Sequence, residues 1–289
     1  MVKTSDNQGR SWSAAYRISP STTNFSGGLT AFAQGSNPQV TANGTVYVAY
    51  EDSVCATLAC NGPNDHDETI VAYSRDHGKT WTNEQVGQNY DFPNNADVAN
   101  ETLTGENFRI NSYPQLTVDP VTQHLYVTWA DDRNGQYNSS GVSVKTDGTA
   151  FISGSADGRH WSPVKAAEPG GDVVFPAVAA LAGKVAVTYY TRSYDPTGID
   201  LDYAYTTLGW DGRYSPQHRV TTQSADPQDQ FVMTGLVTGD VLQGVFIGDY
   251  SAAVIGWDGV LHPVWTDFRG HPGVDTPHQT VDTQAVPLW

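Results

Sequence analysis

The sequence lacks the features that mark several large protein classes. Its 289 residues include two cysteines and two methionines, and no apolar run is long enough to cross a bilayer. Only 15 lysine and arginine residues stand against 31 aspartate and glutamate residues, which gives a formal net charge of −16. A chain this acidic is repelled by the phosphates of nucleic acids and by anionic membrane surfaces. We therefore expect neither nucleic-acid binding nor membrane insertion.

Helical periodicity is also missing. No long stretch places apolar residues three and four positions apart, whereas Val, Thr and Tyr occur in short alternating runs. The 28 glycines and 16 prolines are frequent enough to end these runs at short intervals. The composition therefore predicts an all-β fold with almost no helix.

The two cysteines, Cys55 and Cys60, are close together in one loop-like segment. This spacing favours a local disulfide, with two reduced thiols as the alternative, and two cysteines cannot make a metal site without other ligands. A disulfide, the acidic charge and the low lysine content together predict a secreted or periplasmic protein.

One short phrase occurs several times along the chain. Its aspartate can accept backbone N–H bonds across a turn, its glycine supplies positive φ, and its tryptophan anchors the returning strand. The second copy fits Ser-x-Asp-x-Gly-x-Thr-Trp, and the other two differ from it by one residue between Asp and Gly. Each copy predicts a hairpin turn in which Asp6, Asp76 or Asp157 is structural. The copies are Thr4–Trp12, Ser74–Trp81, Ser155–Trp161 and, in decayed form, Trp210–Tyr214.

Pairs of predicted strands repeat between these phrases. A first strand opens with proline, and a second ends with an aromatic residue, with turn residues such as Asn43-Gly44 between them. The first strands are Pro38–Ala42, Pro114–Val118 and Pro176–Ala180, and the second strands are Val46–Tyr50, Leu125–Trp129, Val185–Tyr189 and Leu261–Trp265. Each unit therefore reads as strand a, turn, strand b, loop, strand c, phrase, strand d.

Repeated units of four antiparallel strands predict a β-propeller, because such sheets bury both faces only by stacking around an axis. Complete units are expected at about 37–108, 109–172 and 173–226. Residues 247–289 supply strands a, b and c of another unit, and residues 1–20 supply only c and d. The two ends either close one composite blade, or residues 1–20 are what remains of a first blade truncated at the N-terminus. The prediction is one domain over 1–289, with five to six blades.

The repeated phrases resemble Asp-boxes, and the chain resembles the bacterial sialidase superfamily of Asp-box (BNR-repeat) propellers over nearly its whole length. This motif is specific for the fold and much less so for function, since such propellers include sialidases, other glycosidases, lyases and binding proteins. The resemblance implies an exo-acting glycoside hydrolase that removes a terminal acidic sugar, sialic acid, from a glycan and needs no cofactor. A non-catalytic glycan-binding propeller and a polysaccharide lyase are the alternatives.

The arginines point to a site at one end of the propeller. Arginine outnumbers lysine ten to five, and four arginines fall where a strand a begins or a strand b ends, which is the upper mouth of such a fold. Guanidinium groups bind carboxylates bidentately, so these four and Asp267 are predicted to bind the acidic sugar. Alternatively, each arginine pairs with a neighbouring carboxylate on a polar rim, where Glu51 and Asp52 also lie. The four are Arg109, Arg133, Arg192 and Arg269.

Catalytic candidates follow from the resemblance. Phe108-Arg109-Ile110-Asn111 resembles the Arg-Ile-Pro element of sialidases, with Asn111 in place of proline, and Asp249-Tyr250-Ser251 resembles their Tyr-Ser element. The resemblance implies that Tyr250 is the nucleophile of a retaining mechanism, with Asp249 beside it. Two features depart from the family: no glutamate follows Glu168 to partner the tyrosine, and the last arginine follows Tyr250 rather than preceding it.

Three further residues and one loop complete the candidate site. Asp131 and Asp132 are the predicted acids, although alternation along a strand turns them to opposite faces. Tyr190 is predicted to stack on a sugar ring. An acidic loop could hold a structural Ca²⁺, while a solvated loop is the alternative. The residues of this loop are Asp195, Thr197, Asp200 and Asp202.

Overall fold

The computed structural model describes residues 1–19, 33–54, 66–95, 100–167, 171–209, 212–227, 247–269 and 279–288. Within these ranges the chain forms strands and turns and no helix, so no helix there could cross a membrane. Cys55 and Cys60 lie outside the described residues, as do Trp210 and Asp211 of the decayed phrase. The disulfide therefore stays a prediction.

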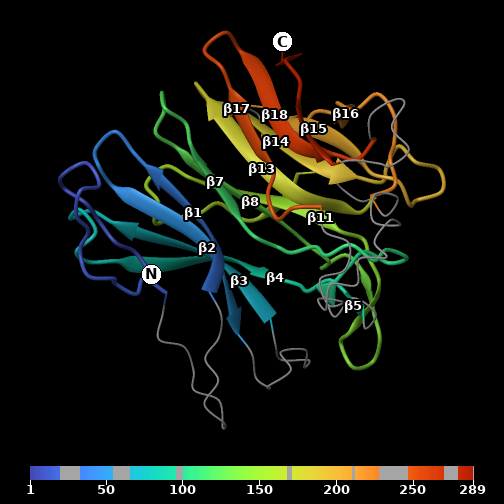
Figure 1. The fold of residues 1–289 in the computed structure, drawn as a ribbon, viewed down its shortest axis with the longest axis horizontal. Helices are drawn as coiled ribbons and strands as arrows, with labels where there is room; N and C mark the ends of the chain where they lie inside the picture. Colours follow the sequence, from blue (N-terminus) through green and yellow to red (C-terminus); the bar gives the residue numbers. More distant parts are fainter. Residues whose placement is uncertain are drawn as a thin grey trace.

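Four antiparallel sheets make up most of the described chain, and we number them as blades in chain order (Figure 1). Blade 1 contains β1 (Ala33–Val40), β2 (Val46–Val54), β3 (His66–Ser74) and β4 (Thr82–Asn89). Blade 2 contains β7 (Gln115–Val118), β8 (Leu125–Asp131), β11 (Thr149–Ser155) and β12 (Lys165–Ala166). Blade 3 contains β13 (Val173–Leu181), β14 (Lys184–Thr191), β15 (Asp202–Leu208) and β16 (His218–Arg219).

Blade 4 departs from this order in its outer part. It contains β17 (Ala252–Ile255), β18 (Val260–Asp267), β19 (Thr280–Thr283) and β20 (Val286–Pro287), and both β19 and β20 pair with β18. There are also two short hairpins. The first, β5 (Asn94–Asn95) with β6 (Asn100–Glu101), lies between blades 1 and 2 in the chain, and the second, β9 (Gln136–Tyr137) with β10 (Ser143–Lys145), lies between β8 and β11 of blade 2.

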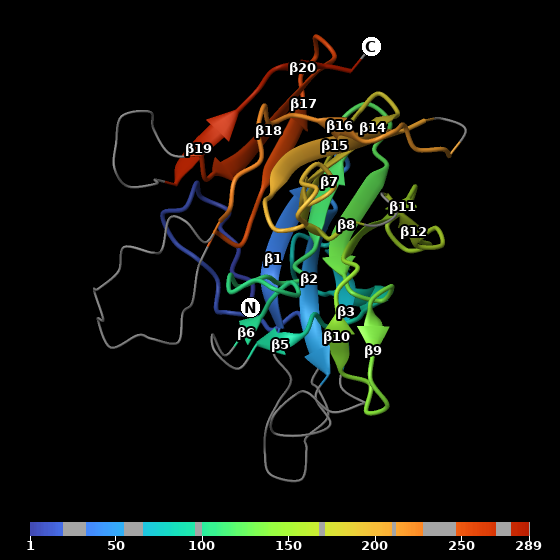
Figure 2. The same cartoon turned by 90° about the vertical axis from the view of Figure 1, so that its right-hand side faces the viewer.

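The blades stack around a common axis as a β-propeller. Their a strands contact one another in the order β1, β7, β13, β17 (Figure 2). The a–b turns at the far end of these strands are also linked, since the Ala42 amide donates to Gln123 Oε1 at 2.6 Å. The next link runs from the Ala182 and Gly183 amides to the carboxylate of Asp119, at 3.0 and 2.6 Å. These observations confirm the predicted all-β propeller of four-stranded blades.

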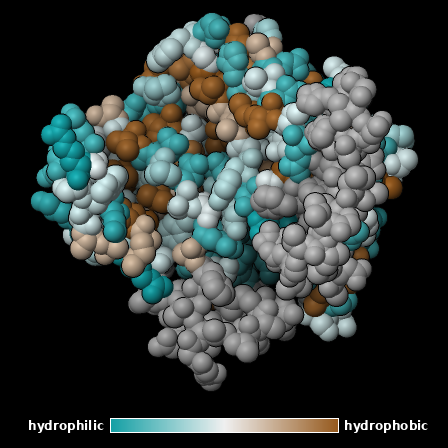
Figure 3. Space-filling view, in the orientation of Figure 1, coloured by the Kyte–Doolittle hydropathy of each residue, from teal (hydrophilic) through white to brown (hydrophobic). Residues whose placement is uncertain are grey.

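Burial of the a strands depends on their place in this series. All nine residues of β13 are buried, whereas β1 and β17, which end the series, leave alternate residues exposed. Val40 and Val254 are therefore exposed, and hydrophobic atoms appear along this part of the surface in Figure 3. At the N-terminus, Val2 and Tyr16 pair antiparallel as predicted, and this hairpin packs on blade 1 through Ile18. The total of five to six blades and the single domain remain predictions.

The repeated phrase folds as the predicted turn in blade 1. Asp76 Oδ1 accepts the Lys79 and Thr80 amides at 3.0 and 2.8 Å, and the Thr80 hydroxyl donates to Oδ2 at 2.6 Å. These bonds, led by the one from the Thr80 hydroxyl, lower the pKa of Asp76. The blade 2 copy works in the same way, since Asp157 accepts the Arg159 and His160 amides, each at 2.9 Å.

The first copy of the phrase uses a different residue from the one predicted. Asn7, not Asp6, accepts the Ser11 amide at 2.9 Å, while the Ser5 hydroxyl accepts the Gly9 amide at 2.8 Å. The segment therefore reads Ser-x-Asn-x-Gly-x-Ser-Trp, in the same spacing as the blade 1 copy. Asparagine fills the aspartate position because the turn needs only a short side chain with an acceptor oxygen.

Replacing Asp119 with alanine is expected to destabilise the fold by about 2 kcal/mol, because four backbone amides lose a charged acceptor. Two of these amides are its own turn's Val121 and Thr122, and two belong to the next blade. Burial opposes ionisation of Asp119, but these bonds outweigh burial and lower its pKa. The stabilisation should thus be lost as pH falls through that lowered pKa. Urea unfolding of the variant at pH 7 and pH 3 checks both points, and a loss unchanged by acid would contradict this role of the carboxylate.

Candidate active site

Three of the predicted site residues meet where the a strands of blades 2 and 4 begin. Arg109, before β7, forms an ion pair with Asp249, before β17, although 140 residues separate them in the chain. The Asn111 side chain also donates to Asp249 Oδ1, at 3.1 Å. Both members of the ion pair are partly exposed, at 32% and 22% of their side chains. We call this region the mouth.

Two tyrosines lie beside this ion pair. The rings of Tyr113 and Tyr250 stack with centroids 5.9 Å apart, and Tyr250 is 56% exposed. Tyr113 rests on the backbone of Gly35 in blade 1, where a Cβ atom would lie 2.6 Å from the ring. Burial and the neighbouring Asp249 raise the pKa of Tyr250, while Arg109 opposes them. This environment disfavours a phenolate, and the exposed ring is suited to stacking on a sugar.

Carboxyl groups with raised pKa values form the wall of the mouth toward blade 1. Glu51, at the end of β2, is buried, and no hydrogen-bond partner for its Oε1 is present in the described part of the chain. Burial, then the charge of Asp67, raises its pKa well above the usual range. The pKa of Glu101 in β6 is also raised, first by burial and then by the charge of Asp91. Its carbonyl accepts the Ile110 amide at 3.0 Å, which places Glu101 beside the residue that follows Arg109.

Arg133 and Asp131 form a structural pair within blade 2. The guanidinium contacts both oxygens of Asp131, at 2.9 and 2.6 Å, and lies 3.9 Å from the ring centroid of Phe151. Trp129 Nε1 donates to the same carboxylate at 3.0 Å. Asp131 is fully buried. Its oxygens are thus used to hold the end of strand b.

The same arrangement recurs in blade 4. Arg269 contacts both oxygens of Asp267, at 2.9 and 2.7 Å, and extends to Asp282 on β19 at 2.9 Å. In both blades the arginine amide also donates to the aspartate Oδ1, at 3.0 Å. Trp129 and Trp265 precede the pairs at the same spacing, so Trp-x-Asp-x-Arg is a repeated structural unit.

Arg192 is buried inside the protein at the end of β14. It donates to Glu106 at 2.7 Å and to Asp172 at 2.8 Å, and bridges two segments that precede and follow blade 2. Burial raises the pKa of Glu106 to about 7, although the guanidinium opposes this rise. Arg192 therefore compensates buried carboxylates and does not extend into the mouth.

Asp132 faces away from Asp131, as alternation predicts. It is buried and accepts the Ser143 hydroxyl and, at 2.8 Å, the Asp147 amide. Burial raises its pKa to about 6, and these two hydrogen bonds moderate the rise. Its carboxylate orders the segment that carries β10.

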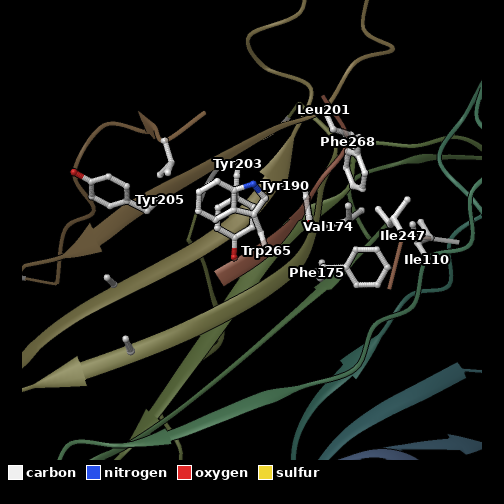
Figure 4. Packing of buried hydrophobic residues seen from close by; sticks show 14 of the residues in the cluster. Ile110, Val174, Phe175, Tyr190, Leu201, Tyr203, Tyr205, Ile247, Trp265 and Phe268 are labelled. Carbon is white, nitrogen blue, oxygen red and sulfur yellow. The ribbon is translucent and has the colours of Figure 1, made fainter. Parts of the chain in front are cut away.

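The structure corrects the expectation for Tyr190. Its ring does lie on the face opposite Tyr189, but that face packs against blade 4, and only 3% of the residue is exposed (Figure 4). The ring stacks on Phe268 at 5.7 Å and meets Tyr203 edge-on at 4.9 Å. Its hydroxyl donates to the Thr266 carbonyl at 3.0 Å. Because blades cover both faces of β14, Tyr190 is a core residue and contacts no sugar.

The carboxylates of the acidic loop before β15 accept hydrogen bonds from other groups of the protein. Asp195 accepts the Ile199 and Asp200 amides, both at 2.8 Å, and Asp202 accepts Arg219 Nε at 2.8 Å. In the part of the chain that the structure describes, no three His, Cys, Asp or Glu residues form a group that could hold a metal ion.

The sequence-predicted site is thus divided. Arg109, Asp249 and Tyr250 meet at the mouth, while Arg133, Arg192 and Arg269 are each held by other carboxylates elsewhere, so they form no common cluster. Sequence analysis did not find Tyr113 or Glu101. Tyr113 could have been found from its place between Arg109 and β7, whereas no sequence motif pointed to Glu101.

No family model and no curated protein matches the sequence. Among solved structures, an alpha-L-arabinanase of Penicillium chrysogenum shares 17% identity over 96% of this chain and 71% of its own, with a TM-score of 0.46. An intramolecular trans-sialidase of Ruminococcus gnavus shares 15% identity over 89% of this chain and 71% of its own, with a TM-score of 0.45. A protein of unknown function from Dyadobacter fermentans shares 13% identity over 88% of this chain, with a TM-score of 0.48, and this chain spans 60% of its length.

Proposed function

We propose that the protein is a glycoside hydrolase whose active site is the mouth. The observation that carries this proposal is the presence of carboxyl groups in two environments around Tyr113. Burial raises the pKa values of Glu51 and Glu101 well above the usual range, which favours their protonated forms, whereas Asp249 is paired with Arg109. Hydrolysis of a glycosidic bond needs one protonated and one ionised carboxyl group on either side of the bond.

The roles follow from burial and exposure. Glu101 is half-buried, so its carboxyl group can donate its proton to the leaving oxygen, and burial, then the charge of Asp91, raises its pKa. Asp249, fixed by Arg109 and Asn111, accepts a proton from the attacking water. The hydroxide of that water ends on the anomeric carbon, and Tyr250 on Tyr113 supports the sugar ring.

The sialidase form of the proposal depends on Arg109. A sugar carboxylate needs a guanidinium partner, and Arg109 is the arginine beside Tyr250. In this structure Asp249 already pairs with it, and the other nearby ionisable groups are acids. The mouth therefore favours a neutral terminal sugar, and sialic acid would bind only by displacing Asp249.

A substrate panel tests the function. Wild-type protein is incubated with fluorogenic α-L-arabinofuranoside, β-galactoside and α-sialoside substrates. Turnover of at least one is expected, with the neutral substrates preferred. Binding of sugars without turnover of any substrate would replace the hydrolase by the second candidate, a glycan-binding propeller, which the exposed Tyr250 ring also favours.

Variants of Tyr250 separate a stacking role from a nucleophilic one. Tyr250→Phe keeps the ring and is expected to retain turnover within a few-fold, whereas Tyr250→Ala should raise KM by about tenfold through lost stacking. Steady-state kinetics on the best substrate of the panel checks this. A loss of kcat by about 10³-fold in Tyr250→Phe would instead identify the hydroxyl as the nucleophile that the sialidase resemblance implies.

A further inference from the structure

A cavity lies between blades 2 and 3, on the side of the repeated turns. Its volume is about 470 Å³, which is within the range of small-molecule sites. Aromatic residues of both blades line it, namely Tyr126, Trp161 and Tyr214. Three basic residues, His124, His160 and Lys165, also line it, and all three are exposed.

The corresponding place between blades 1 and 2 is filled. There Tyr47, the second residue of its strand b, packs so closely on Gly158 that a Cβ atom would lie 2.1 Å from its ring. The Tyr47 hydroxyl also donates to the Asp157 carbonyl at 3.4 Å. Tyr126 occupies the same strand position in blade 2, and Gly212 the same turn position in blade 3. Tyr126 instead lies against Gly154 of its own blade, at 3.2 Å from the Cβ position, and among the described residues Gly212 meets Lys165 Nζ in place of a tyrosine ring.

Two polar groups at this cavity have no partner among the described residues. They are the indole Nε1–H of Trp161 and the hydroxyl of Tyr214, both of which are buried atoms. In the blade 1 turn the equivalent indole, that of Trp81, donates to the Gly78 carbonyl at 3.1 Å. Buried donors are normally paired, so the turn of blade 2 lacks a bond that the turn of blade 1 makes.

The basic residues that line the cavity favour a ligand with a negative charge. Lys165 Nζ lies 3.4 Å from the Cβ position of Gly212, at the entrance to the cavity, in a chain whose net charge is −16. His160 is held by Asp157, with Nδ1 2.7 Å from Oδ2. Aromatic walls stack on the apolar faces of pyranose rings, and an ammonium group pairs with a carboxylate.

We propose that this cavity is a binding site for a sugar that carries a carboxylate group, distinct from the mouth. The sugar ring lies among Tyr126, Trp161 and Tyr214, and its carboxylate pairs with Lys165. The site would hold an acidic glycan chain on the protein without hydrolysing it.

Calorimetry with digalacturonic acid and with the neutral galactobiose tests the site. The acid should bind at one site per chain and at least about tenfold more tightly than galactobiose, because a bond to a charged group is the stronger one. Lys165→Glu should abolish binding of the acid. Lys79→Glu, the same charge change on the exposed turn of blade 1, should leave it within twofold of wild type.

Binding in this experiment is independent of catalysis at the mouth. Glu101→Gln should bind digalacturonic acid like the wild type, so the second site stands even if no glycoside is hydrolysed. The absence of binding, equal affinity for the two sugars, or equal weakening by Lys165→Glu and Lys79→Glu would each overturn the proposal.

Discussion

Replacing Arg192 with methionine is expected to lower the free energy of unfolding by about 3–5 kcal/mol at pH 7.5, because two buried carboxylates lose their common partner. Methionine keeps much of the side-chain volume, so the loss reports charge compensation more than packing. Glu106 and Asp172, the two partners, come from segments more than 60 residues apart. The exposed Arg159 on the blade 2 turn offers a matched control, and Arg159→Met should change stability by less than about 0.5 kcal/mol.

The loss should depend on pH in a defined direction. The pKa of Glu106 is about 7 in the folded protein against a usual 4.5, so the folded state holds this proton more tightly than the unfolded chain. Its contribution to stability is therefore present at low pH and lost as the pH rises toward 7. Without Arg192 the pKa rises further, so the deficit of Arg192→Met should shrink between pH 7.5 and pH 5. Urea unfolding followed by tryptophan fluorescence measures this, and a deficit that is constant with pH would contradict it.

The sequence predicts the fold well because the propeller is built from local signals. Turn phrases, proline-led strands and Asn-Gly turns lie within single blades, and each forms largely from its own residues. Two of these signals were wrong in detail. Asp6 was taken for Asn7 because the spacing was counted from an aspartate rather than from any short acceptor side chain. Pro38 and Pro176 do not open their strands but lie within β1 and β13.

The site is less accessible to such reasoning because its pairs are distant in sequence. Trp-x-Asp-x-Arg repeats at the ends of two b strands, and comparison of these repeats shows that Arg133 and Arg269 have local partners. Asp249, the partner of Arg109, lies 140 residues away, and Glu106, one of the two partners of Arg192, lies 86 residues away, so only the packing of blades reveals these pairs. The positions of these arginines relative to strand b place them at one end of the propeller. Positions alone do not show which arginines are neutralised by carboxylates of the protein.

The charge balance of the mouth follows from these distant pairs. Once each candidate arginine has a carboxylate partner, the acids that remain at the mouth are crowded by one another rather than compensated. Burial and then crowding raise the pKa values of Glu51 and Glu101, so the feature that argues against a sialic acid site also favours the protonated carboxyl group that hydrolysis of a neutral glycoside requires.

Replacing Glu101 with glutamine is accordingly expected to lower kcat by about 10²–10⁴-fold with little change in KM, because the amide cannot donate the proton to the leaving oxygen. In the wild type, burial and then the charge of Asp91 raise the pKa of Glu101 well above its usual range, so the rate should fall as the pH rises through that pKa. Glu84→Gln on β4, a carboxylate outside the mouth, is the matched control and should keep both the rate and the pH profile. Substrates with good leaving groups need less protonation, so the loss in Glu101→Gln should be smaller for an aryl glycoside than for a disaccharide. If Glu101→Gln keeps both the rate and the fall in rate at high pH, Glu101 is not the acid. Glu51 would then be the acid, and Glu51→Gln should lose both.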